Sequence, residues 1–274
     1  MKLAVCNEFF EGWKIERVFD YAAQIGCDGV EIAPFTLADS VKRISATRRR
    51  NIRLAAEKAG VEIVGLHWLL LKPAGLYINH PDRKIWKRTQ DYVKALIDFC
   101  GDLGGEVMIH GSPQQRNIEK GWDDGDCWER TVDLFAGCTD LMAKRGVTYC
   151  IEPLTTKETN FITSIGEALK LVDAVGHSNF QTMVDCRSAD TEAKPHVDVI
   201  AEAGKAMRHV HVNDPNLRGP GFGDLEFTPI LRALKDRAYT GYVSVEVFDF
   251  EPDPQTIASR SIGYLRGILD GLSG

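Results

Sequence analysis

Two glutamates stand at the ends of short apolar runs in distant parts of the chain. The stretch TYCIEPL (Thr148–Leu154) places Glu152 directly after Cys150 and Ile151, and VSVEVF repeats the pattern with Glu246. A carboxylate can take or give a proton beside a carbonyl group, and it can also bind a hard divalent cation. Two such groups facing one substrate could remove a proton on one side and return it on the other.

These glutamates belong to a larger set of polar residues, one near the end of each apolar run. All but one of the set are His, Asp or Glu: Asn7, Glu31, His67, His110, Glu152, Asp185, His211 and Glu246. The last four come from four successive runs. Three carboxylates brought into one place would repel each other strongly unless a positive charge lay among them. The set therefore predicts a divalent metal ion bound by Glu152, Asp185, His211 and Glu246.

The ligand types indicate which metal would bind. Three carboxylate oxygens and one imidazole nitrogen favour Mn²⁺, with Mg²⁺, Co²⁺ and Zn²⁺ also compatible. Cys186 follows Asp185 and should point the other way, so we expect it to be a packing residue. His209 lies two residues before His211 and shares its face, so periodicity alone allows either as the ligand. We assign His211, which is nearer the strand end, and give His209 a supporting role.

The elements that must position these residues alternate between strands and helices. The predicted strands cover residues 2–6, 29–33, 62–68, 106–110, 148–153, 180–185, 207–213 and 242–248. The predicted helices cover residues 14–25, 40–59, 82–103, 126–145, 164–175, 192–204, 228–237 and 255–271. Eight such units indicate a closed parallel barrel, since an open sheet of that size would leave edges to cover. We therefore predict a single (β/α)8 TIM barrel, forming one domain over residues 1–274.

Turn residues support this order of elements. Glycines in AQIGCDG, EKAGVE, AKRGVT and DAVGHS follow predicted helices, where a left-handed residue ends a helix. Asp82 and Ser164 should begin helices, the latter with Glu167 in a capping box. A doubly wound sheet would carry a glycine-rich turn after its first strand, whereas this chain reads NEFFEGWK there. The barrel is therefore the preferred architecture.

Composition and charge indicate the cellular location of the protein and the partners it can bind. Hydrophobic residues make up 44% and charged residues 26%, and no run approaches the roughly 18 apolar residues of a membrane span. The amino terminus lacks a secretory pattern, and the seven cysteines form no CxxC pair, so we expect a cytoplasmic protein with reduced thiols. A net charge of −6 disfavours nucleic-acid partners. The basic run Lys42–Arg53 is interpreted as a solvated helix face.

At four strand ends the residues match a known pattern. The chain resembles the xylose isomerase-like TIM-barrel superfamily of sugar isomerases and epimerases in four motifs. These are IEP, VD, HVHVND with a following GPGFG turn, and SVEVF. Within it the chain is most similar to ketose 3-epimerases of the D-tagatose 3-epimerase type. The resemblance implies that Glu152, Asp185, His211 and Glu246 bind one metal and that the two glutamates form the acid/base pair. It also implies that Glu158 contacts the substrate and that the protein forms a homo-oligomer, dimer or tetramer.

The chain departs from the family pattern at two positions. Ser188 stands where the family commonly has His, and Arg218 lies two residues after Asn216 where the family has Arg directly after Asn. We nevertheless assign Arg218 to substrate binding. His67 and His110 complete the predicted substrate-binding set, because both lie near predicted strand ends.

The predicted chemistry is proton transfer through an enediolate of a small sugar or keto-acid. Sequence alone does not separate an epimerase from an aldose–ketose isomerase, because both use the same groups. A non-phosphorylated ketose is favoured, since FDFEPDP after the last strand is acidic. The alternatives are hydroxypyruvate isomerase-like or keto-glycoside isomerase or lyase chemistry, a non-catalytic binding protein and, more remotely, an endonuclease IV-like DNA repair enzyme.

Overall fold

Eight parallel strands form the centre of the protein and close into a barrel in chain order, so the predicted TIM barrel is confirmed. The computed structural model describes residues 1–273. The strands are β1 (Lys2–Cys6), β2 (Gly29–Ile32), β3 (Glu62–Leu66), β4 (Val107–His110), β5 (Thr148–Ile151), β6 (Phe180–Asp185), β7 (Met207–Val212) and β8 (Tyr242–Val245). β1 pairs with both β2 and β8, which leaves no free sheet edge among the eight strands.

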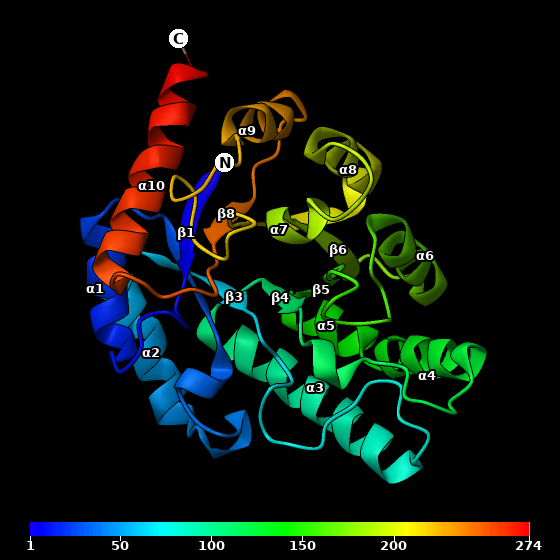
Figure 1. The fold of residues 1–274 in the computed structure, drawn as a ribbon. Helices are drawn as coiled ribbons and strands as arrows, with labels where there is room; N and C mark the ends of the chain where they lie inside the picture. Colours follow the sequence, from blue (N-terminus) through cyan, green and yellow to red (C-terminus); the bar gives the residue numbers. More distant parts are fainter. Residues whose placement is uncertain (274) are drawn as a thin grey trace.

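Helices surround the barrel (Figure 1). They are α1 (Ile15–Gln24), α2 (Ala46–Ala59), α3 (Arg83–Leu103), α4 (Asp124–Ala136), α5 (Thr139–Arg145), α6 (Ile165–Val175), α7 (Cys186–Ala189), α8 (His196–Ala203), α9 (Phe227–Asp236) and α10 (Pro254–Gly271). The four-residue helix α7 follows β6 directly, so it begins at the same end of the barrel as the predicted site.

Side chains alternate between the inside of the barrel and the layer under the helices. Ile109 of β4, Cys150 of β5 and Met183 of β6 pack together as a small separate cluster inside the barrel. Tyr149, next to Cys150, and Phe180, three residues before Met183, face the other way and pack against Phe135 of α4. This period of two decides which residue after each strand reaches the mouth of the barrel.

Helix boundaries follow the predicted turn signals, with three differences. The glycines after α1, α2, α5 and α6 all have positive φ, and Asp82 and Ser164 accept hydrogen bonds from backbone N–H groups of the helices that follow them. The predicted helix 126–145 is two helices, because the chain turns at Gly137. The predicted helices 40–59 and 192–204 begin later, at Ala46 and His196.

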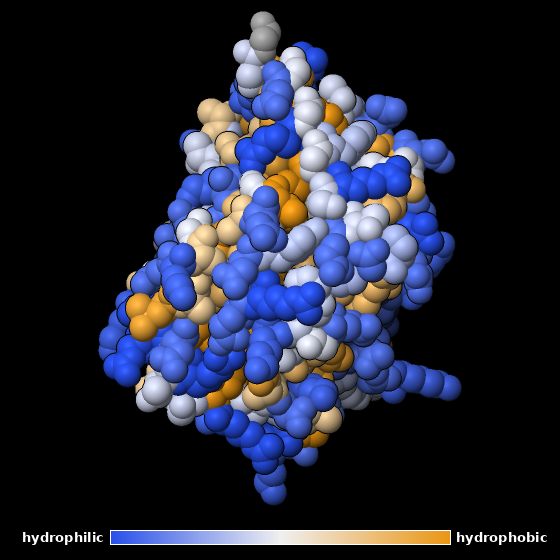
Figure 2. All heavy atoms as spheres, turned by 90° about the vertical axis from the view of Figure 1, so that its left-hand side faces the viewer, coloured by the Kyte–Doolittle hydropathy of each residue, from blue (hydrophilic) through white to orange (hydrophobic). Residues whose placement is uncertain are grey.

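The surface over α1, α2 and α10 is mostly hydrophilic, with apolar atoms in scattered spots (Figure 2). The basic run on α2 is partly neutralised, since Arg48 pairs with Glu16 and Arg49 with Asp102. All seven cysteines are free and buried, as expected for reduced thiols. Within residues 1–273, no helix is long and apolar enough to cross a membrane. The cytoplasmic location stays a prediction.

Candidate metal and acid/base site

Four side chains from neighbouring strands meet at the carboxyl end of the barrel. Glu152 follows β5, Asp185 ends β6, His211 lies in β7 and Glu246 follows β8. All four are buried, and one nitrogen or oxygen atom from each lies within 4.8 Å of those of the others. The structure thus brings together the four residues that the sequence analysis assigned to one metal ion.

The ring of His211 is oriented by hydrogen bonding on one side and faces carboxylates on the other. Its Nε2 lies 3.1 Å from Glu31 Oε1. Its Nδ1 lies 3.1 Å from Glu246 Oε2 and 3.9 Å from Glu152 Oε1. In the described part of the chain, Nδ1 and Glu246 Oε2 are buried without a hydrogen-bond partner. Both atoms can act as metal ligands, and both lie among carboxylates without a hydrogen-bond partner. This arrangement fits a divalent cation.

Neutral donors hold Asp185 in place. Its Oδ1 accepts a 2.7 Å bond from the Ser188 backbone N–H, and its Oδ2 accepts a 2.6 Å bond from Asn213 Nδ2. The side-chain oxygen of Asn213 accepts in turn from the Arg187 backbone N–H at 2.9 Å. Because Ser188 acts through its backbone, the departure from the family pattern at this position leaves the orientation of Asp185 intact.

Glu152 is positioned by close packing at the ends of β4 and β5. The completely buried guanidinium of Arg116 donates a 2.6 Å bond to the Glu152 carbonyl and another bond to the carbonyl of His110. Burial lowers the pKa of Arg116 to about 10. The side-chain carboxylate lies over Gly111, where an added Cβ would be 1.9 Å from Glu152 Oε2. Gly111 therefore makes room for this carboxylate.

Trp68 orients the second glutamate. Its indole N–H donates a 3.1 Å hydrogen bond to Glu246 Oε1, and its ring meets Phe248 edge to face at 6.3 Å. Trp68 has a φ of 51°, a conformation that costs a bulky residue free energy and that recurs at functional sites. This strained turn after β3 directs the indole toward the cluster.

Crowding of the acids changes their protonation. Burial and the neighbouring Glu246 raise the pKa of Glu152 well above its usual value, and the same two causes raise the pKa of Asp185. Burial opposes charge on His211, but Glu246 and Glu31 outweigh it and hold the pKa of His211 well above its ordinary value. The metal-free cluster therefore holds extra protons, which a divalent cation would displace.

A cavity, part of it open to solvent, lies above the cluster. It is lined by Trp68, Gly111, Pro113, Glu152, Leu154, Glu158, Asp185, Arg187, Glu246 and Phe248. A larger depression opens at the other end of the barrel, where Lys2, Glu62 and Tyr242 bond to one another. We take the smaller cavity as the candidate site, because Glu152, Asp185 and Glu246, three of the four residues of the cluster, line it.

Glu158 lines this cavity together with a cation that the sequence analysis missed. Its Oε1 lies 2.5 Å from Arg187 Nη2, and its Oε2 accepts a 3.0 Å bond from Thr155 Oγ1. The Arg187 guanidinium also lies over the Phe248 ring, 4.5 Å from its centroid. The only available signal for Arg187 was its place two residues after Asp185.

Three predicted substrate-binding residues lie outside the cavity lining. His110 Nδ1 bonds to Tyr149 Oη at 2.6 Å, and its ring packs edge-on against Phe135, so it faces the helix layer. Placing His110 at the mouth was wrong: Ile109 points inward, so the next inward position is Gly111.

Arg218 and His67 are the other two. Arg218 is a half-buried loop residue that pairs with Asp249 at 2.8 Å and is not part of the cavity wall. His67 lies beneath the four-residue cluster, where its Nε2 is 2.7 Å from Glu8 Oε2. Neither residue lines the cavity, and their assignment to substrate binding stays a prediction.

The chain is similar in sequence and in fold to several known sugar epimerases. The family model described as xylose isomerase-like TIM barrel matches residues 19–268. The D-psicose 3-epimerase of Agrobacterium fabrum is 32% identical over 239 residues, covering 85% of this chain and 78% of that protein. The fructoselysine 3-epimerase of Shigella flexneri is 23% identical over 266 residues, 93% of each chain. A crystal structure of D-psicose 3-epimerase in the presence of D-fructose superposes with a TM-score of 0.87 at 21% identity, covering all of both chains.

Proposed function

The chain belongs to the xylose isomerase-like TIM barrel family, and from this premise we propose that it is a metal-dependent epimerase of a non-phosphorylated ketose. The observation that carries the proposal is the placement of Glu152 and Glu246, which come from β5 and β8 and line the same cavity. Asp185 and His211, from the two strands between them, complete the ring of donors.

In this proposal the two glutamates exchange protons with the substrate. One carboxylate removes the proton from the carbon next to the substrate carbonyl, and an enediolate forms. The other glutamate then returns a proton to the opposite face, which inverts the configuration at that carbon. Trp68 holds Glu246 in a fixed orientation for this step, and Gly111 leaves Glu152 the room to reach the substrate.

Glu152, Asp185, His211 and Glu246 would hold the metal, with Mn²⁺ the expected ion. When bound, a divalent cation supplies electrostatic stabilisation for the negative charge that develops on the substrate oxygens. Asn213 and the Ser188 N–H fix Asp185, while Glu31 fixes His211, so the ligand set is oriented in advance.

The rest of the cavity suits a small polyhydroxylated substrate. Glu158 and Arg187 offer a paired acceptor and donor for hydroxyl groups, and Trp68 and Phe248 form an apolar wall that excludes water. The loop after β8 carries Asp249, and its pairing with Arg218 removes a cation that could bind phosphate. These features support a sugar without a phosphate group.

Deuterium exchange tests the proposed reaction directly. The Mn²⁺-loaded protein is incubated in D₂O with D-psicose, D-tagatose, L-ribulose, fructoselysine, a keto-glycoside and hydroxypyruvate, and proton spectra are recorded. We expect exchange at the carbon next to the carbonyl of at least one ketose, with formation of its epimer. Exchange with hydroxypyruvate or the keto-glycoside alone would instead support the alternative chemistries.

Isosteric variants test the two acid/base residues. Glu152→Gln and Glu246→Gln should each lower kcat by about 10²- to 10⁴-fold, the usual contribution of a positioned acid or base. Glu129→Gln on the exposed face of α4 is the control and should leave kcat unchanged. Full activity of Glu246→Gln, or no exchange on any compound, would contradict the proposal.

A further inference from the structure

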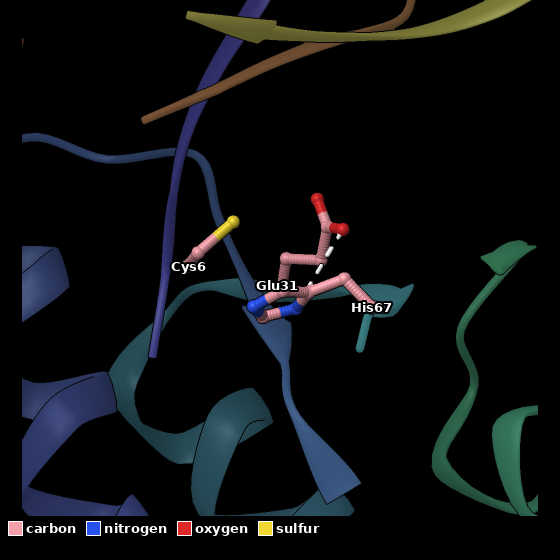
Figure 3. Close-up of side chains that lie close together, drawn as sticks. All are labelled: Cys6, Glu31 and His67. Carbon is pink, nitrogen blue, oxygen red and sulfur yellow. Dashed lines mark ion pairs between the residues drawn. The ribbon is translucent and has the colours of Figure 1, made fainter. Parts of the chain in front are cut away.

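A second group of potential metal ligands lies near the first, deeper in the barrel. Cys6 ends β1, Glu31 lies in β2 and His67 directly follows β3 (Figure 3). The side chains are completely or almost completely buried, and one donor atom from each lies within 4.8 Å of the others. None of the three is among the ligands assigned above.

Glu8 determines which nitrogen of His67 faces this group. His67 Nε2 lies 2.7 Å from Glu8 Oε2, a distance at which the ring donates its N–H to the carboxylate. In the neutral ring the lone pair is then on Nδ1. Nδ1 lies 3.7 Å from Glu31 Oε1, and it is buried without a hydrogen-bond partner in the described residues. A carboxylate that orients a histidine in this way is a frequent feature of metal sites.

The group therefore presents a lone pair and a carboxylate oxygen toward each other, with a thiol beside them. Facing acceptors in a buried site are unfavourable unless a proton or a cation lies between them. Two ligand atoms of a tetrahedral Zn²⁺ ion with bonds of about 2.0–2.1 Å are roughly 3.3 Å apart, so a contraction of a few tenths of an ångström would accommodate the ion.

Charge gives an independent reason to expect a cation here. Five buried carboxylates share the interior of this end of the barrel: Glu8, Glu31, Glu152, Asp185 and Glu246. A single divalent ion at the first site offsets two of these charges, and buried carboxylates without compensation are costly.

We propose that Cys6, Glu31 and His67 form a second, buried site for a thiolate-binding divalent cation such as Zn²⁺. Binding replaces the thiol proton: the S–H bond breaks, the sulfur–metal bond forms, and one proton is released to solvent. The sulfur, nitrogen and oxygen donors make this site softer than the first one, which offers no sulfur. The two sites should therefore prefer different metals.

The competing explanation places a second proton on His67, which would then bridge Glu8 and Glu31 as an imidazolium. That arrangement also satisfies both carboxylates and needs no metal. The two explanations differ in metal content and in the presence of a metal–sulfur bond, and both can be measured on the intact protein.

Cobalt substitution distinguishes them. The full-length protein is stripped of metal and loaded with Co²⁺, and the absorbance and metal content are recorded. We expect two equivalents of Co²⁺ per chain and a near-ultraviolet thiolate-to-cobalt band. Cys6→Ser should lose the band and one equivalent. Asp185→Ala should lose the other equivalent and keep the band. Loss of metal binding at the first site can therefore be distinguished from loss at the second.

Cys100→Ser is the matched control, because Cys100 is equally buried on α3 and bonds weakly to the Val107 carbonyl. This variant should keep the band. Circular dichroism verifies that each variant is folded. If Cys6→Ser does not fold, the number of Co²⁺ equivalents and the thiolate band of the parent protein still test the proposal. A parent protein that binds one equivalent without a thiolate band would overturn the proposal in favour of the protonated His67.

Discussion

At the scale of single residues, neutral groups orient two of the three carboxylates of the candidate site. Asp185 is held by a backbone N–H and the Asn213 amide, and Glu246 by the Trp68 indole. These donors fix direction without cancelling charge. The acids therefore remain available to a divalent cation, in contrast to Glu158, whose carboxylate is already paired with Arg187.

Gly111 offers a test of how closely Glu152 must be placed. Gly111→Ala would put a methyl group where Glu152 Oε2 now lies, so the carboxylate has to move. We expect metal affinity, measured by competition with a chelating dye, to fall by about 10- to 100-fold, as for other changes that disturb ligand orientation. The control is Gly263→Ala on α10, where an added Cβ meets nothing within 4 Å. Equal affinity in the two variants would show that the position of Glu152 is not decisive.

At the scale of elements, the barrel positions the site through close strand contacts as well as through alternation. β3 and β4 approach so closely that a Cβ on Gly65 would lie 1.8 Å from the Val107 carbonyl oxygen. Backbone cannot move aside as a flexible side chain can. The strand that leads to His67 and Trp68 is therefore held against the strand that leads to Gly111.

Gly65→Ala should accordingly destabilise the fold by about 1–3 kcal/mol or more, the usual cost of overpacking. Gly267→Ala, on the exposed face of α10 with open space around it, should stabilise the protein by about 0.5–1 kcal/mol. Urea unfolding of both variants and the parent protein measures the difference. If Gly65→Ala matches the parent, the two strands are able to separate without cost.

At the scale of the whole molecule, the buried acids link folding to pH and to metal. In the metal-free protein the pKa of Glu152 is raised well above its usual value of about 4.5 by burial and by Glu246. The folded state then keeps a proton that the unfolded chain has released. Stability from this group is full below the unfolded pKa and is lost as the pH rises through the folded pKa.

We therefore expect the metal-free parent protein to lose free energy of unfolding, relative to Glu152→Gln, as the pH is raised from 5 to 8. The amide cannot ionise, so the difference between the two proteins isolates this group. Thermal unfolding over this pH range measures it. A parent protein that gained stability relative to the variant would contradict the raised pKa.

Adding Mn²⁺ at pH 8 should reverse the loss in the parent protein. An ion at 100 times its Kd stabilises the folded state by about 2.7 kcal/mol, so Tm should rise by several degrees. Asp185→Ala, which lacks one proposed ligand, should show a much smaller rise. An equal rise in both proteins would place the bound ion elsewhere.

The sequence was sufficient for the architecture and for the four-residue cluster, and for a common reason. Eight apolar runs alternate with helical segments, four helix ends are marked by glycine, and barrel closure brings all strand ends to one rim. Glu152, Asp185, His211 and Glu246 could thus be grouped without any knowledge of distances. The same reasoning placed His110 at the mouth, because it took the nearest polar residue without following the alternation that turns His110 outward and Gly111 inward.

Tertiary structure alone decided the contacts that cross between loops. These contacts join segments that no local sequence pattern relates to each other. They are the pairing of Arg187 with Glu158, the bond from Trp68 to Glu246, and the position of His67 between Glu8 and Glu31. Side-chain direction at these places depends on backbone conformation after the strand ends, as the positive φ of Trp68 illustrates. Sequence periodicity ends where the strands end, so these contacts were set by packing in three dimensions.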